Sequence, residues 1–595
     1  MFLSAPVLVA QTLAEREKIT ENYDLEKLSQ MEAEYAELFA QGKQYALEMA
    51  IIYGWEEFLE LPNGGIAELV NVSEDGRPIY IGTTNREGGI TTRTDRVHTG
   101  GTAGLDLNGE NMIAGIWDGG RVRETHELLQ NRVDQIDGTT IISNHSTHVA
   151  GTMIGTGTVQ GGAAKGMAPE AELWAYSFNN NISEMTTAAA NGLLISNHSY
   201  GITAANVPIW QLGYYSVSAK NVDNIVYNAP YHLPVFAAGN ARNTGVNPGD
   251  GGYDILTAYA TGKNIIVSAA TFEVLNYTGP GSVIMSSFSS WGPPDDGRIK
   301  PDLAAKGVSM FSSTGTTNNT YANFSGTSMS SPNTSGSLIL LQQHYNEINS
   351  EFMLSSTLRG LVLHTADEAG TSTGPDYRFG WGLMNTERAA ETITDNGTST
   401  IIIEETLQQG EVYTFSVQSD GVNDLWASVT WTDPPGNTLG AGNNDIETPS
   451  LINDLDIRVS QDGGSTFFPW KLDVNDFTAP ATTGDNLVDN IEKIEIPGAS
   501  GEYIIRVSHK GFLFNDSQVF SIIITGIDRE EFYVSSHQGI KEACASDGSA
   551  AIEIDLAFSD GFSDTINFTV SDLPAGTTGA INPSSLNTDG TVILT

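Results

Sequence analysis

Cysteine is almost absent from this chain, whose 595 residues include only Cys544. A single thiol excludes a disulfide within the chain, and it excludes a zinc site built from cysteines. We therefore expect the fold to be stabilised by its hydrophobic cores, with bound ions as the one addition that the composition allows.

Basic residues are scarce as well. Lys and Arg together number 28 against 72 Asp and Glu, which gives a formal net charge of −44. This charge disfavours nucleic acid and anionic membrane surfaces as partners. A solvated acidic coat that keeps a secreted protein soluble is one interpretation, and acidic loops that hold calcium ions are the other.

Long apolar runs are also missing, so no membrane span is predicted. The first residues, MFLSAPVLVAQT, are apolar and small and lack a basic start. We interpret residues 1–12 as the remnant of a secretory signal peptide, with a frayed terminus as the alternative. The expected location is extracellular, or at the cell surface if a sorting tail follows the sequence.

The sequence patterns divide the chain into several segments, as expected because a chain of this length is too long to fold around a single hydrophobic core. Within residues 13–95, apolar residues recur at helical spacing from Leu13 to about Trp55, and strand-like residues 66–81 follow. The polar stretch NREGGITTRTDRVHTGGTAG comes next and has the composition of a linker.

The larger part of the chain predicts an α/β domain followed by β domains. Residues 96–398 alternate helical patterns with short apolar runs such as NMIAGIWD and LPVFAAGN, which predict a parallel sheet with helices on both faces. Residues 399–528 carry regularly spaced strand patterns, including VYTFSV and EYIIRVSHKG, which predict a β jelly roll or sandwich. The strand patterns of residues 529–595 are too few to close a sandwich, so we interpret them as a partial immunoglobulin-like module.

Three segments of the α/β domain could carry chemistry. Asp118 ends the strand pattern IAGIWD, at the sheet edge where ligands bind, although capping or turn formation is the commoner role of such an aspartate. Ser328 follows Gly326 at a turn entering a helix, whose N–H groups and dipole favour developing negative charge. His145 and His148 share the first turn of the helix predicted from SNHSTHVAGT, and the pattern alone does not say which is a base.

With Asp118, His145 and Ser328 in that order along the chain, the three segments resemble the subtilisin family of serine peptidases. GMAPEAEL, NHSYG, VFAAGN, FSSWGP and KPDLAAKG match further family segments in the same order, and the resemblance covers roughly residues 105–395. The family motif is His-Gly-Thr-His, and its first histidine is the base. The resemblance therefore implies that His145 is the base and that His148 is structural.

The resemblance implies acyl transfer through an Asp-His-Ser triad. Ser328 would attack the peptide carbonyl, His145 would carry the proton, Asp118 would orient the imidazole, and Asn240 would contribute to the oxyanion hole. No cofactor is implied for catalysis, the partners are protein or peptide substrates, and a monomer is expected. The implied substrate-binding residues are Ser199, Tyr200, Gly201, Ala238 and Gly239.

Three positions depart from the family pattern or are specific to this chain. Ser146 replaces the usual glycine after the base, where a side chain could either crowd the cleft or contribute a hydroxyl. Lys306 replaces a proline, which we interpret as a change in a surface loop. Tyr200 lies in the cleft segment, where it is expected to shape a substrate pocket.

The flanking segments also resemble parts of family members. Members are usually made with an N-terminal propeptide, which implies that residues 13–95 are removed by cleavage between about residues 85 and 105. A permanent helical extension is the alternative. Residues 399–528 resemble the jelly-roll domain that follows some of the catalytic domains.

A structural calcium ion is a further hypothesis for the β domain. The motifs NDLD and VDN offer clustered carboxylate and amide oxygens of the kind that calcium prefers, whereas turn formation at strand ends is the alternative explanation. The candidate ligands are Asn453, Asp454, Asp456, Asp489 and Asn490.

Three other functions compete with a secreted endopeptidase. An inactive scaffold that is adhesive through its β domains is disfavoured by the intact triad and Asn240. The Ser-Glu-Asp carboxyl peptidases share the fold, but they place a glutamate where His145 stands. A lipase or esterase would need Gly-x-Ser-x-Gly, whereas the segment around Ser328 reads GTSMS.

Overall fold

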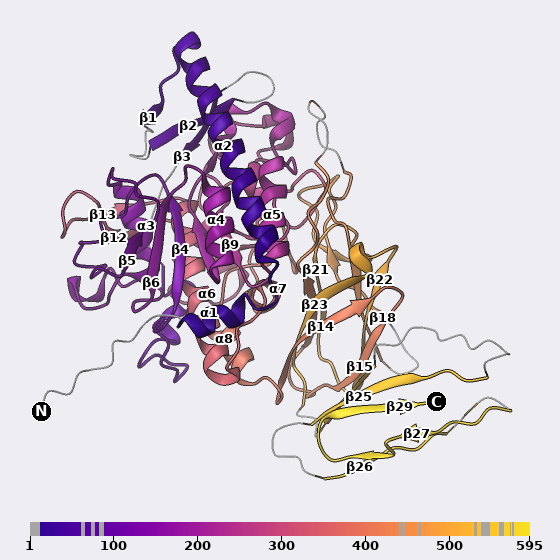
Figure 1. Cartoon of the computed structure of the whole chain (residues 1–595). Helices are drawn as coiled ribbons and strands as arrows, with labels where there is room; N and C mark the ends of the chain where they lie inside the picture. The colour runs from indigo at the N-terminus through magenta and orange to yellow at the C-terminus, as the bar shows by residue number, and fades with distance from the viewer. Residues whose placement is uncertain are drawn as a thin grey trace, which may run out of the picture. The chain divides into compact units, whose positions relative to one another are not determined.

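In the computed structural model, the chain forms two compact units (Figure 1). The first comprises Met1–Glu391, Thr432–Ser450 and Leu472–Thr482, and the second comprises Thr392–Trp431, Leu451–Lys471 and Thr483–Thr595. The interpreted signal remnant, apart from Thr12, and Cys544 lie outside the described residues. The structure describes residues 12–60, 66–72, 78–82, 88–438, 442, 447–461, 466–528, 532–536, 548–558, 564–571, 573 and 576–595.

A seven-stranded sheet forms the centre of the first unit, and every pairing in it is parallel. Its middle strands are buried along their whole length, which explains the apolar runs of IAGIWD and LPVFA, although one equally buried strand reads ISNH. The predicted parallel α/β fold is confirmed. In spatial order the strands are β11 (Leu303–Lys306), β10 (Ile266–Thr271), β9 (Leu233–Ala237), β7 (Ile195–His198), β4 (Ile113–Asp118), β6 (Glu172–Ser177) and β5 (Val133–Gln135).

Helices pack against this sheet in two groups. The long helix α6 (Thr327–Asn349) contacts β7, β9, β10 and β11, and it also packs on α3 (Asn144–Ile154). Helices α4 (Asn181–Ala190) and α5 (Val217–Asn228) pack on one another. The unit also contains α7 (Ser355–His364), α8 (Thr386–Thr394) and the hairpin of β12 (Met310–Ser313) with β13 (Tyr321–Phe324).

The N-terminal segment of this unit contains two helices where the sequence predicted one. Helix α1 (Leu13–Ile19) ends at Thr20, and α2 (Leu25–Tyr53) begins after Asp24, whose carboxylate accepts the Lys27 N–H (2.9 Å) as an N-cap. Figure 1 shows α2 lying along α4 and α5, which it contacts.

Three short antiparallel strands follow α2 along the chain. They are β1 (Phe58–Glu60), β2 (Ile66–Val72) and β3 (Pro78–Gly82), and β3 pairs in turn with β8 (Gly201–Ile202). The N-terminal segment therefore forms one sheet with the segment that directly follows Tyr200.

The second unit is built from antiparallel strands in two sheets. Its fully buried core includes Trp431, Ile505 and Phe520, and the inward and outward side chains of β15 alternate as predicted for a sandwich. One sheet contains β14 (Thr400–Gln408), β23 (Ser517–Thr525), β16 (Leu425–Trp431) and β21 (Ile491–Ile496). The other begins with β18 (Thr466–Phe467), β17 (Asp454–Gln461), β22 (Glu502–Lys510) and β15 (Tyr413–Gln418).

The C-terminal strands continue the second of these sheets. β24 (Phe532–Ser536) pairs with β15, and β25 (Ile552–Phe558), β29 (Gly590–Leu594) and β27 (Ile581–Asn582) follow in order. The smaller two-stranded ladders of the chain are β19 (Trp470–Lys471) with β20 (Thr482–Thr483), and β26 (Ile566–Asn567) with β28 (Ser585–Leu586). Over the described residues, no helix has the length and apolar character needed to cross a membrane.

Candidate active site

Asp118 is the last residue of the central strand β4, and its side chain is fully buried. The carboxyl ends of parallel strands form the edge where ligands bind in such sheets. Its Oδ1 atom accepts the backbone N–H of Gly119 at 2.7 Å, whereas its Oδ2 atom is buried without a hydrogen-bond partner among the described residues. This arrangement leaves a carboxylate oriented at the edge of the sheet.

His145 lies in the first turn of α3 and points at Asp118. The N-cap residue Ser143 accepts the backbone N–H groups of His145 and Ser146, each at 3.1 Å, which fixes the start of the helix. The distance from His145 Nδ1 to Asp118 Oδ1 is 2.6 Å. Because a carboxylate only accepts, Nδ1 carries the proton, and the buried Nε2 makes no hydrogen bond within the described part of the chain.

His148 occupies a different environment, one helical turn further along α3. Its Nε2 atom lies 3.1 Å from the backbone carbonyl oxygen of Met310, and its ring stacks on Phe324. The structure therefore brings His145, and not His148, to Asp118.

Ser146 directs a hydroxyl at the same carboxylate. Its Oγ donates to Asp118 Oδ1 at 2.9 Å, and the side chain is fully buried. The sequence left open whether the Ser146 side chain crowds the cleft or contributes a hydroxyl. In the structure it contributes a hydroxyl.

Ser328 lies in the first turn of α6, directly after the N-cap Gly326 and Thr327. Two reciprocal hydrogen bonds join it to Ser199, in the segment after β7. The Ser328 hydroxyl donates to the Ser199 carbonyl oxygen at 3.0 Å, and the Ser199 hydroxyl donates to the Ser328 carbonyl oxygen at 2.8 Å. The N-terminus of a long helix places positive electrostatic potential near the Ser328 side chain.

Asn240 follows the end of β9 and is oriented by Thr327. Its Oδ1 atom accepts from the Thr327 backbone N–H at 2.9 Å and from the Thr327 hydroxyl at 3.2 Å. Gly239, directly before it, has a φ of 105°, a region that favours glycine, and a Cβ atom there would lie 2.9 Å from Ser290 Oγ. With its oxygen held, the Asn240 side chain presents its NH2 group as a donor.

A cavity of about 200 Å³ adjoins Ser328 and Asn240. Of the sequence-predicted substrate-binding residues, Tyr200, Gly201, Ala238 and Gly239 line it, and Ser199 does not. Every lining residue is uncharged at neutral pH. The remaining lining residues are Ile202, Thr203, Ala204, Ala205, Ala237, Ala241, Thr244, Ile255, Thr257, Tyr259, Ala260, Ser290 and Thr327.

Tyr200 is held in this cavity wall by a buried chain of hydrogen bonds. Its hydroxyl accepts from Asn181 Nδ2 at 2.6 Å and lies 2.8 Å from His198 Nδ1, while His198 Nε2 lies 2.8 Å from Ser196 Oγ. Burial holds the pKa of His198 well below its ordinary value and the pKa of Tyr200 well above it. Both side chains are therefore neutral near pH 7, and the chain fixes Tyr200 without introducing charge.

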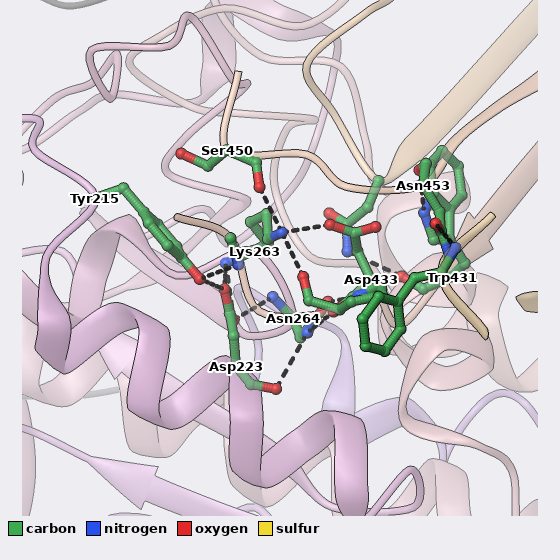
Figure 2. Close-up of polar contacts among 12 residues, drawn as sticks. Tyr215, Asp223, Lys263, Asn264, Trp431, Asp433, Ser450 and Asn453 are labelled. Carbon is green, nitrogen blue, oxygen red and sulfur yellow. Dashed lines mark hydrogen bonds and ion pairs between the residues drawn. The ribbon is translucent and has the colours of Figure 1, made fainter. Parts of the chain in front are cut away.

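The first unit also contains a buried network centred on Lys263 (Figure 2). The Lys263 ammonium pairs with the carboxylate of Asp433 and donates to the carbonyl oxygens of Pro434 and Ser450, each at 2.7 Å. Asp223 accepts the backbone N–H groups of Lys263 (3.0 Å) and Asn264 (2.9 Å). Asp433, Pro434 and Ser450 thus hold Lys263, which follows the cavity-lining residues 259 and 260 in the sequence.

The expectation for Lys306 is wrong. The sequence predicts a surface loop at this position, but Lys306 is the last residue of β11 and is only 4% exposed. Its ammonium lies 3.1 Å from the carboxylate of Glu273, which compensates the burial of the charge.

The calcium candidates of the second unit bond to protein groups. Asp456 Oδ1 lies 2.7 Å from both Lys510 and Arg458, and Asp454 Oδ1 lies 3.3 Å from Lys510. The Asn453 side chain bonds to Gln518 and Phe514, Asp489 accepts from Asn486, and Asn490 donates to the Trp431 carbonyl oxygen. Within the described ranges, no three His, Cys, Asp or Glu side chains are grouped as a metal site. Calcium binding here stays a prediction.

Two residues of the site were missed by sequence reasoning. Thr327 orients Asn240 across 87 positions of sequence, and Asn181 orients Tyr200 from α4. Thr327 belongs to the motif around Ser328 and could have been examined on that ground. No sequence signal marks Asn181, because its role arises only when α4 is packed.

The described residues thus include a buried aspartate at the carboxyl edge of a parallel sheet, a histidine bonded to it, and a serine at a helix N-terminus beside a cavity. These are the kinds of group that acyl transfer uses. Residues 115–382 match the sequence model of the Subtilase family, and this part of the chain is a subtilisin-like α/β domain.

Two curated proteins and one solved structure are similar to parts of this chain. The chain is 27% identical to subtilisin DY of Bacillus licheniformis over 303 residues, which cover 48% of this chain and 92% of subtilisin DY. It is 22% identical to the serine protease/ABC transporter B family protein tagA of Dictyostelium discoideum over 542 residues, 71% of this chain. The matched part spans only 30% of the length of tagA. The solved self-cleaved protease domain of PatA aligns with 48% of this chain and 97% of its own, at 20% identity and a TM-score of 0.38.

Proposed function

We propose that this protein is a serine endopeptidase that hydrolyses peptide bonds through Asp118, His145 and Ser328. The observation that carries the proposal is the buried 2.6 Å contact between Asp118 and His145 Nδ1, at the sheet edge that β4 shares with the segment bonded to Ser328. A neutral imidazole oriented in this way has its Nε2 atom available to take a proton.

The proposed reaction proceeds through an acyl-enzyme. The Ser328 hydroxyl leaves the Ser199 carbonyl, transfers its proton to His145 Nε2, and its Oγ attacks the substrate carbonyl carbon. His145 then protonates the leaving amine as the C–N bond breaks. A water molecule, deprotonated by His145, attacks the acyl ester and releases Ser328 as a free hydroxyl.

The oxyanion of each tetrahedral intermediate needs fixed hydrogen-bond donors. The NH2 group of Asn240 is one, since Thr327 already holds the oxygen of that side chain. A backbone N–H in the first turn of α6 is the second, and the helix dipole adds to its effect.

The lining of the cavity beside Ser328 suggests the substrate class. It holds no charged side chain, so a Lys, Arg, Asp or Glu side chain entering it would lose hydration without an ionic partner. We infer that the residue before the cleaved bond is uncharged, and that the substrates are proteins or peptides rather than nucleic acids.

The N-terminal segment is proposed to be a propeptide, and the protein a secreted zymogen. Strand β3 pairs with β8, whose residues Gly201 and Ile202 line the cavity, and α2 packs on α4 and α5, so these two elements of the N-terminal segment are attached to the α/β domain. Cleavage between about residues 85 and 105 would free the mature enzyme. The apolar first residues support export, and the acidic composition suits an extracellular protein.

Intact mass tests these proposals together. The purified chain and its Ser328→Ala variant are incubated side by side, and each mass is followed with time. We expect only the parent chain to lose its N-terminal segment, and only the parent to cleave a protein substrate. If both chains stay full length and neither cleaves the substrate even after treatment with an added protease, an inactive, adhesive scaffold becomes the better interpretation.

A further inference from the structure

We propose that Ser146 is a positioning residue of the triad, which fixes the carboxylate of Asp118 and lowers the basicity of the Asp118–His145 pair. This inference rests on the proposed function of the same site. It concerns a position at which this chain departs from the glycine that is usual after the base.

The geometry places three donors on one oxygen atom. Asp118 Oδ1 accepts from His145 Nδ1 at 2.6 Å, from Gly119 N–H at 2.7 Å and from Ser146 Oγ at 2.9 Å. The other oxygen, Oδ2, is buried without a partner among the described residues. Rotation of the carboxylate about its Cβ–Cγ bond would break all three bonds and is therefore resisted.

Two of these donors come from adjacent residues of one rigid helical turn. Ser143 caps the backbone N–H groups of both His145 and Ser146, so the imidazole and the hydroxyl move together with the start of α3. Ser146 is fully buried, and its hydroxyl donates to the Asp118 carboxylate. The hydroxyl therefore holds the Asp118 carboxylate in a fixed orientation relative to α3, the helix that carries His145.

The hydroxyl also has an electrostatic effect. A hydrogen bond donated to a carboxylate stabilises the anion and reduces the charge that it offers to a neighbouring imidazolium. Removal of the hydroxyl leaves more negative charge facing His145. The imidazole would then become protonated at a higher pH, and activity would be lost at a higher pH on the acid side.

Three other titratable groups are linked electrostatically to Asp118, directly or through one another. None of them is expected to change its charge on the acid limb of the pH profile. Tyr200 interacts electrostatically with Asp118, and burial holds the pKa of Tyr200 well above its ordinary value, so it stays neutral. Glu184 of α4 acts on Tyr200 and has a pKa of about 8, raised by burial, so its titration lies on the alkaline side. Asp137 in turn acts on Glu184, and its own pKa lies below the ordinary value.

The test measures kcat and KM of the parent enzyme, Ser146→Ala and Ser146→Gly on one peptide substrate, at pH values between 4.5 and 7. We expect kcat to fall about tenfold with little change in KM, the scale of one charge-assisted hydrogen bond. We expect the midpoint of the acid limb to rise by about half a pH unit. Thr152→Val is the matched control, since Thr152 carries a buried hydroxyl of α3 that donates to the His148 carbonyl oxygen at 3.0 Å.

Each outcome bears on the proposal. A merely structural role of Ser146 would lower the melting temperature of both variants and leave the acid limb where it is, which would overturn the inference. The inference would also be overturned if the parent enzyme and both variants had equal kcat values and the same midpoint of the acid limb. If one variant does not fold, the other supplies the comparison. Activity retained by Ser328→Ala would instead refute the proposed function, so the two failures are distinguishable.

Discussion

Lys263 and Asp433 lie 170 positions apart in the sequence and form an ion pair in which both side chains are fully buried. The ammonium is also bonded to two backbone carbonyl oxygens, so all three of its N–H groups have acceptors (Figure 2). The backbone of Asp433 pairs with the Asn264 side chain through bonds of 2.8 and 2.9 Å. A charge this deep is tolerated because every donor is satisfied.

Removal of one member of this pair should be strongly destabilising. We expect Asp433→Ala to lower the free energy of unfolding by about 3–5 kcal/mol, because the ammonium stays buried without its counter-ion. The double variant Lys263→Met/Asp433→Leu should lose less than the sum of the single effects. Urea unfolding in the Ser328→Ala background, which prevents self-digestion, measures these differences.

Lys18→Met is the matched control for that experiment. Its partner is Glu351 at 3.0 Å, and both side chains are more than half exposed, so its loss should cost under about 1 kcal/mol. Equal effects of Lys18→Met and Asp433→Ala would show that the buried pair contributes no more than a surface pair.

Asn240→Ala should impair catalysis far more than substrate binding. We expect kcat to fall by about 10²–10³, a scale that comes from subtilisin itself, with KM nearly unchanged. Thr327→Val should give a smaller loss, because it frees only one of the two donors that hold the Asn240 oxygen. Steady-state kinetics of the processed enzymes provide the comparison, and an Asn240→Ala enzyme with parental kcat would remove this residue from the mechanism.

Cleavage should favour uncharged residues at the position before the scissile bond. Peptides that differ only there, with Leu, Phe, Lys or Glu, should show kcat/KM values lower by about 10²-fold for the charged residues, because the cavity offers them no ionic partner. Mass spectrometry of a digested peptide library reports the same preference without a designed substrate. A clear preference for Lys or Arg would mean that the primary pocket lies elsewhere.

Glu184 should make the stability of the protein depend on pH. Burial, with a contribution from Asp137, raises its pKa to about 8, so the folded state keeps a proton that the unfolded state releases near its ordinary, lower value. The stabilisation is complete below the unfolded pKa and is lost as the pH rises through about 8. Melting temperatures from pH 5 to 9, in the Ser328→Ala background, should decline less for Glu184→Gln than for its parent.

The Gln side chain keeps an oxygen for the Trp117 Nε1 hydrogen bond of 3.1 Å, so the packing of α4 is preserved in that variant. Identical declines in the two proteins would show that Glu184 is ionised in the folded state across this range.

The sequence was sufficient for the α/β fold and for the identity of the candidate residues. Strands buried on both faces are rich in apolar residues, so β4 and β9 are visible as apolar runs, whereas the equally buried β7 ends in Ser196, Asn197 and His198. Asp118 and Ser328 occur at junctions that the same patterns mark, the end of a strand and the start of a helix. The resemblance to the subtilisin family, and not periodicity, distinguished His145 from His148.

What the sequence could not determine is how distant segments meet. The burial of Lys306, the hydroxyl that Ser146 directs at Asp118, and the support that Asn181 gives Tyr200 all depend on contacts across the folded domain. The same is true of Lys263, whose counter-ion comes from a segment between two strands of the β region. The local sequence pattern indicates which face of a helix or strand is buried. The partner of a buried polar group depends instead on how the elements pack in three dimensions.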